Sequence, residues 1–550
     1  MGEDANVSTF IVKCLENEGV EFVFGIPGEE NIHFVDALGA SNIRFILARS
    51  EQGASFMADM YGRVTGKAGV CTATLGPGAI NLLLGVADAQ CDSTPVVAIV
   101  AQVGLNRIYK ETHQFVDLVR LFEPVTKRAA MLHTPPATAE MVRAAFKTAQ
   151  TERPGATLLA IPQDVAEMPA GEAAPLAINH VRPEAPSPTQ IARAAKILGE
   201  AKNPVVLAGH GLARAGAQDA LVAFAERLNI AVANTFHGKG AMPDDHPNAL
   251  GTVGFMVRDY ANFGFDAADV IVAVGYELQE FPPAKINPDG TKRIIYIHRF
   301  PAEVDANFNI AAGIEGDIAQ ALDALAAATT PKPSLNTEGA CIKSLLAEEI
   351  ETGRTNPSFP LAPQRIVADV RTAMGPDDIV LADTGAIKMW FARLYPTYRP
   401  NTCLISNGLA TMAFALPGAL GVKLANPDRK VLAVMGDGSF MMNSQEIETA
   451  LREKIPFVIL IFVDDSFGLI KWKMDLEMGH HSHVDFKNPD FVAYAESFGA
   501  KGYRIEAADE LLPTLNAALK DDTVSVIACP VDYTHNNKLT DRLGELTQPI

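Results

Sequence analysis

Short apolar runs alternate with amphipathic helical patterns along most of this chain. The run 431–435 ends at the turn 436–439 (Gly-Asp-Gly-Ser), and the run 457–463 ends at Asp464. Short apolar runs that are bounded by turn signals are typical of buried parallel strands. The segment 446–454 between them has the pattern of a helix. The sequence therefore predicts two strands of one parallel sheet that are joined through a helix.

The same alternation divides the chain into parts. Stretches rich in Pro, Ala, Glu or Thr predict linkers at 168–188 and 328–333, and an irregular stretch at 352–363 precedes a helical pattern at 364–374. A chain of 550 residues is also too long for one hydrophobic core. We predict an α/β protein of three doubly wound parallel-sheet domains. The predicted domains are 1–168, 189–328 and 360–545.

The middle domain opens on an apolar run at 204–208, which is followed by Gly-His-Gly at 209–211. A strand that ends in Gly-x-Gly is a weak signal for dinucleotide binding, and Arg214 stands where the full motif has its last glycine. Structural and nucleotide-binding roles are both open for this domain, and we favour the structural role.

Composition limits the class of protein. A net charge of −19 argues against a nucleic-acid partner. The six cysteines form no CxxC pairs, which argues against a disulfide framework or a zinc site. No apolar run approaches the roughly 20 residues that cross a bilayer, and the N-terminus has no basic-then-apolar signal segment. We therefore expect a cytoplasmic protein without a membrane partner.

Two carboxylates follow the two predicted strands of the last domain. Asp437 and Asp464 would leave the carboxyl ends of their strands, where open α/β sheets hold ligands. Magnesium prefers oxygen ligands and often binds phosphate oxygens as well. The pattern predicts a magnesium–diphosphate site, although a Gly-Asp-Gly sequence alone can be a simple turn.

Glu51 follows a predicted strand at 43–48 and would begin a helix. A glutamate in a first helical turn often only complements the helix dipole. The next predicted strand, 70–73, leads into Gly-Pro-Gly at 76–78, a tight turn that lets backbone approach a ligand closely. Glu51 therefore either only complements the helix dipole or is part of a ligand site.

Several motifs in order resemble one enzyme family along nearly the whole chain. They are 24–28, 51–54, 76–78, Asn81, 405–412, 436–439 with Asp464, and 493–500. The chain is similar to thiamine diphosphate-dependent acetolactate synthases, with the catabolic branch that lacks FAD as the nearest match. The resemblance implies pyrimidine-binding, central Rossmann-like and diphosphate-binding domains. It also implies a homodimer or a dimer of dimers (a homotetramer) with active sites between subunits.

The resemblance also implies roles for individual residues. Glu51 matches the glutamate that hydrogen-bonds the aminopyrimidine ring, and Met412 matches the residue that supports the bent cofactor. Asp437, Asp464 and Ser466, the last through its carbonyl, match the magnesium ligands. The other residues that match cofactor contacts are Pro27, Gly28, Thr74, Gly76, Pro77, Asn81, Gly385, Ala386, Gly408, Gly436, Gly438, Ser439, Phe467, Gly468 and Leu469. The family usually has His before the glutamate, where this chain has Ser50.

His113 and Gln114 bear on the reaction. Related decarboxylases resemble one another in having a His-His pair here, which can protonate the bound intermediate and release an aldehyde. Gln114 has no titratable proton, so we favour carboligation of two pyruvates into 2-acetolactate and CO₂. The alternatives are a related 2-oxo acid decarboxylase, an acyltransferase such as a sulfoacetaldehyde acetyltransferase, and a non-catalytic paralogue. His113 and Gln114 could also merely cap a loop.

Other positions leave alternatives open. Lys473 stands where the catabolic relatives have Gln, and it either binds an anionic substrate or is a solvated helix charge. The histidines 480, 481 and 483 form either a metal site or, as we favour, a polar loop over the active site. The region 251–283 resembles the branch without FAD, so we do not expect FAD.

Overall fold

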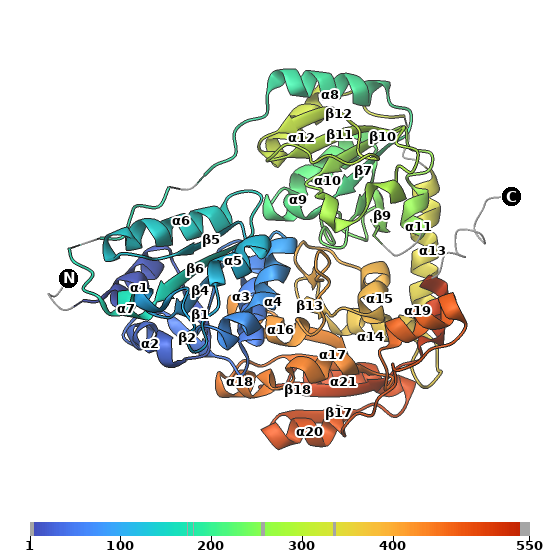
Figure 1. Ribbon diagram of the computed structural model, residues 1–550. Coiled ribbons are helices and arrows are strands. Elements are labelled where there is room, and N and C mark those ends of the chain that lie inside the picture. Colours follow the sequence, from blue (N-terminus) through green and yellow to red (C-terminus); the bar gives the residue numbers. More distant parts are fainter. Residues whose placement is uncertain (1–4, 173, 180, 255–258, 334–336, 540–550) are drawn as a thin grey trace.

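Three six-stranded sheets organise the computed structural model, one in each third of the chain (Figure 1). The structure describes residues 5–172, 174–179, 181–254, 259–333 and 337–539. Neighbouring strands in all three sheets run parallel. Their residues are largely buried, as expected of sheets that carry helices on both faces. The predicted α/β fold class with three parallel sheets is confirmed.

The N-terminal sheet has the strand order β2-β1-β3-β4-β6-β5. Its strands are β1 (Phe22–Gly25), β2 (Arg44–Leu47), β3 (Gly69–Ala73), β4 (Val96–Gln102), β5 (Arg128–Met131) and β6 (Ala156–Pro162). Its helices are α1 (Val7–Asn17), α2 (Ile32–Gly39), α3 (Glu51–Thr65), α4 (Pro77–Cys91), α5 (Leu118–Phe122), α6 (Thr138–Gln150) and α7 (Gln163–Glu167). Because β2, β1 and β3 are neighbours, the loops that follow them meet at one edge of the sheet.

The middle sheet has the order β12-β11-β10-β7-β8-β9. Its strands are β7 (Pro204–Ala208), β8 (Ala231–Asn234), β9 (Ala249–Thr252), β10 (Val270–Val274), β11 (Arg293–His298) and β12 (Ile310–Glu315). Its helices are α8 (Pro188–Glu200), α9 (His210–Arg214), α10 (Gln218–Leu228), α11 (Tyr260–Phe263) and α12 (Ile318–Ala328).

The C-terminal sheet has the order β14-β13-β15-β16-β18-β17. Its strands are β13 (Ile379–Ala382), β14 (Cys403–Leu404), β15 (Val431–Gly436), β16 (Val458–Val463), β17 (Lys501–Arg504) and β18 (Ser525–Pro530). Its helices are α14 (Pro363–Ala373), α15 (Ala386–Leu394), α16 (Ala415–Ala425), α17 (Asp437–Asn443), α18 (Glu446–Arg452), α19 (Gly468–Met478), α20 (Phe491–Phe498) and α21 (Leu511–Ala518). The two strands predicted from the apolar runs, β15 and β16, are direct neighbours.

The connection between the middle and C-terminal sheets differs from the sequence prediction. Helix α13 (Thr337–Arg354) occupies most of it and packs against α14 (Figure 1). The predicted irregular stretch 352–363 was therefore wrong at its start, because α13 continues to Arg354. The predicted domain limits 1–168, 189–328 and 360–545 stay a prediction, and residues 1–4 and 540–545 lie outside the described part.

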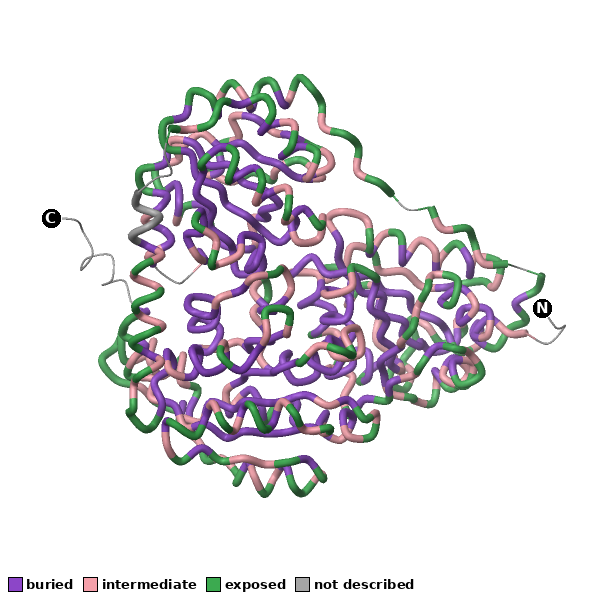
Figure 2. Tube along the Cα trace, turned by 180° about the vertical axis from the view of Figure 1, so that it is seen from behind, coloured by how far each residue is buried: buried purple, intermediate pink, exposed green. Residues whose placement is uncertain are grey.

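One hydrophobic core joins the N-terminal and C-terminal sheets, and buried residues run through both (Figure 2). Helix α3 packs against α16 in this core. The two helices approach so closely that a Cβ on Gly421 would lie 2.2 Å from the carbonyl oxygen of Met57. The contact therefore fixes the two sheets relative to each other. No described helix is long and apolar enough to cross a membrane.

Candidate active site

The loops after β1 and β3 meet at the edge of the N-terminal sheet. A Cβ on Gly28 would lie 2.5 Å from the Cβ of Thr74, so glycine is required for this approach. The hydroxyl of Thr74 donates a hydrogen bond to Glu30 at 2.6 Å, and the side chain of Asn31 accepts one from the Gly28 backbone at 2.6 Å. These bonds hold the two predicted contact residues, Gly28 and Thr74, side by side.

Glu51 begins α3 directly after β2, as the sequence predicts. The side-chain amide of Asn81, on the first turns of α4, donates a hydrogen bond to Glu51 Oε2 at 3.2 Å. The other carboxylate oxygen would lie 3.2 Å from a Cβ on Gly78. The structure thus brings Glu51 to the start of α4, beside the Gly-Pro-Gly turn.

Gln114 lies against the same turn. A Cβ on Gly76 would meet the carbonyl oxygen of Gln114 at 2.4 Å, and Gly76 has a positive φ of 49°. Gln114 itself has a positive φ of 56°, which is uncommon for a residue other than glycine. The neighbouring His113 is exposed. Gln114 is therefore held near Glu51 by backbone packing, and both side chains can reach solvent-accessible space.

Asp437 lies at the carboxyl edge of the C-terminal sheet, at the start of α17. Its Oδ2 accepts hydrogen bonds from the backbone N–H groups of Asp464, at 3.0 Å, and Asp465, at 2.8 Å. The Asn488 amide donates a further bond to the same oxygen at 2.8 Å. The loops after β15 and β16 are therefore tied together at Asp437, which is only 1% exposed.

The Asp464 carboxylate is the second acidic group at this edge. Its Oδ2 accepts a hydrogen bond from the Ser466 hydroxyl at 2.7 Å, and it would lie 2.5 Å from a Cβ on Gly468. Burial raises the pKa of Asp464 to about 7, and the charge of Asp437 adds to this effect. Burial also raises the pKa of Asp437.

Neither of these carboxylates pairs with a Lys, Arg or His side chain among the described residues. Two desolvated carboxylates repel each other unless a cation compensates them. The oxygen atoms of Asp437, Asp464 and Ser466 are the donor type that a hard divalent cation prefers. The residues present therefore fit such a cation at this edge of the sheet.

Glycine backbone lies beside these carboxylates, with open space at Gly385. Gly385, which precedes α15, has a φ of 144°, and a Cβ there would meet no atom within 4 Å. A Cβ on Gly438 would lie 2.9 Å from the ring of Phe467, whose side chain is partly exposed. Several predicted contact residues share this edge of the sheet: Gly385, Ala386, Gly436, Gly438, Ser439, Phe467, Gly468 and Leu469.

Met412 lies in the loop 405–414, between β14 and α16. Its side chain is half-buried. Ala410 and Ala413 have positive φ values of 56° and 67°, a conformation that costs a residue with a Cβ about 1–2 kcal/mol. Such residues persist where the surroundings hold the backbone in place. The loop that carries Met412 is therefore under backbone strain.

Lys473 lies on α19, three residues after Ile470, so the two share a helix face. Ile470 is 49% exposed, whereas Trp472 packs against the core of the C-terminal sheet. No hydrogen bond or ion pair involves Lys473 in the part of the chain that the structure describes. Lys473 is therefore on the side of α19 that faces away from the core.

The histidines after α19 do not gather around a common point. His481 pairs with Asp475 at 2.7 Å, and His480 lies 3.2 Å from the Met478 carbonyl oxygen. Within the described ranges, no group of three or more His, Cys, Asp or Glu residues could hold a metal ion. The alternative of a histidine metal site at 480–483 therefore finds no support.

The Gly-x-Gly turn of the middle sheet is filled by side chains of this chain. A Cβ on Gly209 would lie 2.5 Å from Glu280 Oε1, and one on Gly211 would lie 2.5 Å from His298 Nε2. Arg214 forms ion pairs with Glu152, at 3.0 Å, and with Glu277. This buried ionic cluster occupies the place where a dinucleotide phosphate approaches a Gly-x-Gly turn.

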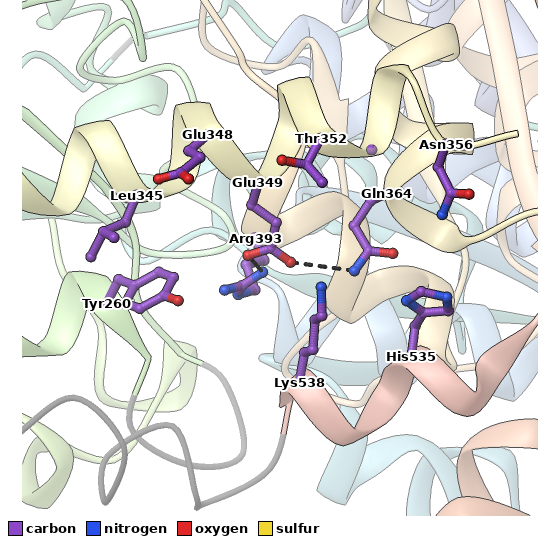
Figure 3. Close-up of a pocket in the computed structure, with 11 residues that line it drawn as sticks. Tyr260, Leu345, Glu348, Glu349, Thr352, Asn356, Gln364, Arg393, His535 and Lys538 are labelled. Carbon is purple, nitrogen blue, oxygen red and sulfur yellow. Dashed lines mark hydrogen bonds and ion pairs between the residues drawn. The ribbon is translucent and has the colours of Figure 1, made fainter.

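A separate cavity of about 320 Å³ lies between α13, α14 and the 3₁₀ helix Tyr533–Leu539 (Figure 3). Arg393 forms ion pairs there with Glu349, at 2.6 Å, and with Asp259, at 2.7 Å. None of the residues predicted to bind cofactor or metal lines this cavity. Its charged groups join α13 and α11 to the C-terminal sheet.

Sequence reasoning missed several residues of these clusters. Asn488 contacts Asp437, Glu446 accepts hydrogen bonds from the backbone next to Glu51, and Asp383 accepts one from Ala413. Asn488 stands in an Asn-Pro-Asp sequence that signals the start of a helix. No local signal connects any of these side chains with its distant partner.

Comparisons with known proteins agree with this arrangement. Three family models match: "Thiamine pyrophosphate enzyme, N-terminal TPP binding domain" at residues 5–121, the "central domain" at 191–325, and the "C-terminal TPP binding domain" at 383–529.

Curated relatives match over almost the whole chain. The "Probable acetolactate synthase large subunit" of Methanocaldococcus jannaschii is 36% identical over 98% of this chain and 95% of the relative. The "Acetolactate synthase, catabolic" of Raoultella terrigena is 36% identical over 98% of this chain and 97% of the relative. The "Acetolactate synthase" of Bacillus subtilis is 33% identical over 98% and 96%. The chain therefore belongs to the acetolactate synthase family of thiamine pyrophosphate enzymes.

Proposed function

We propose that this protein condenses two pyruvate molecules into 2-acetolactate and CO₂, with thiamine diphosphate and Mg²⁺ as cofactors. The position of Gln114 carries the proposal beyond family membership. Its backbone packs on Gly76, which brings it to the turn where Glu51 lies. A glutamine there cannot supply the proton that would release an aldehyde.

Thiamine diphosphate, when bound, would supply a carbon nucleophile and an electron sink for the decarboxylation of pyruvate. The carboxylate of Glu51 would share a proton with the pyrimidine ring of the cofactor, in the role of a general acid and base. The hydrogen bond from Asn81 keeps that carboxylate at the start of α4. Met412 would support the bound cofactor from the loop 405–414.

Asp437, Asp464 and the carbonyl of Ser466 would hold Mg²⁺, which in turn would bind the diphosphate. The buried position of both carboxylates favours a bound cation, because the cation offsets their desolvation. The turns at Gly385, Ala386 and 436–439 would bring backbone N–H groups close to the diphosphate oxygens.

Lys473 supports a second candidate function. It shares an exposed helix face with Ile470 and has no partner among the described residues. A cation there would bind an anionic second substrate, such as a sulfonated aldehyde. In that case the same site would transfer the acyl group to a different acceptor.

We further propose that the protein works as a homodimer or a dimer of dimers. Apolar side chains are exposed beside both candidate half-sites: Ile80 and Leu84 on α4, and Met441 and Met442 on α17. A partner subunit would cover them. The filled Gly-x-Gly turn of the middle sheet supports activity without FAD. The cytoplasmic location stays a prediction from the sequence.

The test is incubation of the purified protein with thiamine diphosphate, Mg²⁺ and pyruvate, without FAD, followed by NMR of the products. We expect acetolactate. Acetaldehyde would keep the cofactor assignment and contradict carboligation. If pyruvate were consumed only after an anionic aldehyde had been added, the second candidate function would be favoured.

A further inference from the structure

Helix α4 of the N-terminal sheet unit contacts the loop 405–414 of the C-terminal sheet unit. Its first turns carry Asn81, which bonds to Glu51. Its last turns carry Asp88, and Asp92 is its C-cap residue. Asp88 and Asp92 are fully buried or nearly so, with 0% and 1% exposure. Both side chains are directed at the loop 405–414, which belongs to the C-terminal sheet.

Asp88 binds the side chains of this loop. Its Oδ1 accepts a hydrogen bond from the hydroxyl of Ser406 at 2.7 Å and another from the hydroxyl of Thr411 at 2.7 Å. The Ser406 hydroxyl oxygen also accepts a bond from the Thr411 backbone N–H at 3.1 Å. Asp88 therefore draws together the start of the loop and the residue that precedes Met412.

Asp92 binds the backbone of the same loop. Its Oδ1 accepts a hydrogen bond from the Gly408 N–H at 2.6 Å, and its Oδ2 accepts one from the Asn407 N–H at 3.2 Å. Gly408 touches the end of α4 so closely that a Cβ would lie 2.6 Å from the Cys91 carbonyl oxygen. A larger residue at 408 would push the loop away from α4.

The charge of Asp92 is compensated by its own neighbours. The Arg63 guanidinium lies 3.1 Å from Oδ2, and the His237 ring lies 3.2 Å from it. Although burial opposes ionisation, His237 and Arg63 hold the pKa of Asp92 below its usual range. Burial and the nearby Asp92 raise the pKa of Asp88 to about 7.

The loop needs such support because its backbone is strained. Ala410 and Ala413, on both sides of Met412, have positive φ values. The Ala413 N–H donates to the buried carboxylate of Asp383 at 2.9 Å, and its carbonyl accepts from Asn443 at 3.0 Å. Asp383 and Asn443 hold the end of the loop, while α4 holds its first half.

We propose that Asp88 and Asp92 are positioning residues for the cofactor, which act by fixing the strained loop 405–414 and, through it, Met412. The proposal rests on the proposed function, since it takes Met412 as a cofactor contact. Neither carboxylate is expected to touch the cofactor. Loss of their hydrogen bonds should let the loop relax, so that cofactor affinity falls although the fold remains.

The test uses variants of the side chains that hold the loop. Thr411→Val removes the hydroxyl and keeps the shape, whereas Thr411→Ser keeps the hydroxyl. Asp92→Asn removes one acceptor for the loop backbone and also the charge that pairs with Arg63 and His237. The control is Thr157→Val, a buried threonine whose hydroxyl lies 3.3 Å from the Ala145 carbonyl oxygen, within the N-terminal sheet unit. The measurements are calorimetric titration with thiamine diphosphate and Mg²⁺, and amide hydrogen exchange of residues 406–413.

We expect Thr411→Val to weaken thiamine diphosphate binding by about tenfold and to speed exchange in the loop by a similar factor, as for one lost buried hydrogen bond. Asp92→Asn should change both values by at least as much, because it also removes a buried charge. Thr411→Ser should restore both values, and Thr157→Val should change neither. Unchanged affinity and exchange in Thr411→Val would overturn the proposal. If the unaltered protein bound no cofactor, the proposed function would fail instead, and loop exchange in the same variants would still show whether the carboxylates hold the loop.

Discussion

Glu446 connects the N-terminal and C-terminal sheet units, and its contribution to the free energy of unfolding should depend on pH. Its carboxylate accepts hydrogen bonds from the Arg49 N–H, at 3.1 and 3.2 Å to its two oxygens, and from the Thr449 hydroxyl at 2.7 Å. The side chain is fully buried. Because Arg49 stands two residues before Glu51, Glu446 ties the start of α3 to the C-terminal sheet unit.

Burial raises the pKa of Glu446 from 4.5 to about 7. Between these values the folded protein binds a proton at this site that the unfolded chain has lost. The free energy of unfolding therefore falls as the pH rises from below 4.5 to above 7, by up to about 3 kcal/mol from this group. Glu446→Gln removes the ionisation, and its other effects on stability do not depend on pH.

The assay is urea unfolding of both proteins between about pH 5 and about pH 8. We expect the stability of Glu446→Gln relative to the unaltered protein to increase by about 2.5 kcal/mol over this range, because part of the titration of the unfolded chain lies below pH 5. The matched control is Glu448→Gln on the same helix, where the glutamate is partly exposed and pairs with Arg452 at 3.0 Å. A stability difference that stays constant with pH, or that decreases as the pH rises, would refute the reasoning.

Four further variants test the candidate active site. Glu51→Gln should bind thiamine diphosphate but lose at least about 100-fold in kcat; unchanged turnover would remove Glu51 from the mechanism. Asp437→Ala should abolish Mg²⁺-dependent cofactor binding by calorimetry, and full retention would place the metal elsewhere. Gln114→His should raise the proportion of acetaldehyde among the NMR-detected products by about tenfold or more, whereas an unchanged product ratio would contradict the role of Gln114. Lys473→Gln should raise KM for an anionic second substrate by about tenfold or more if Lys473 binds it; an equal KM would make Lys473 a solvated charge.

The sequence alone was sufficient to predict the three parallel sheets and the loops on which the candidate site residues lie. Apolar runs followed by turn residues identified β15 and β16, and the carboxyl ends of neighbouring parallel strands share an edge. The sequence alone therefore predicts that Asp437 and Asp464 lie close together. The strand-to-helix junction at Glu51 and the Gly-Pro-Gly turn were recognised for the same reason, because their signals are local.

Helix α13 was not recognised, because it follows a Thr- and Pro-rich stretch and its helically spaced apolar residues, Ile342, Leu345, Leu346 and Ile350, cover only part of its length. The contacts that hold the candidate site together also could not be predicted from the sequence. Glu446 and Arg49 are 397 residues apart, and Asp92 and Gly408 are 316 apart. A buried carboxylate needs hydrogen-bond donors, but its own sequence pattern does not indicate which distant backbone provides them. Only the packing of α3 and α4 against the C-terminal sheet unit brings these donors and acceptors within hydrogen-bond distance.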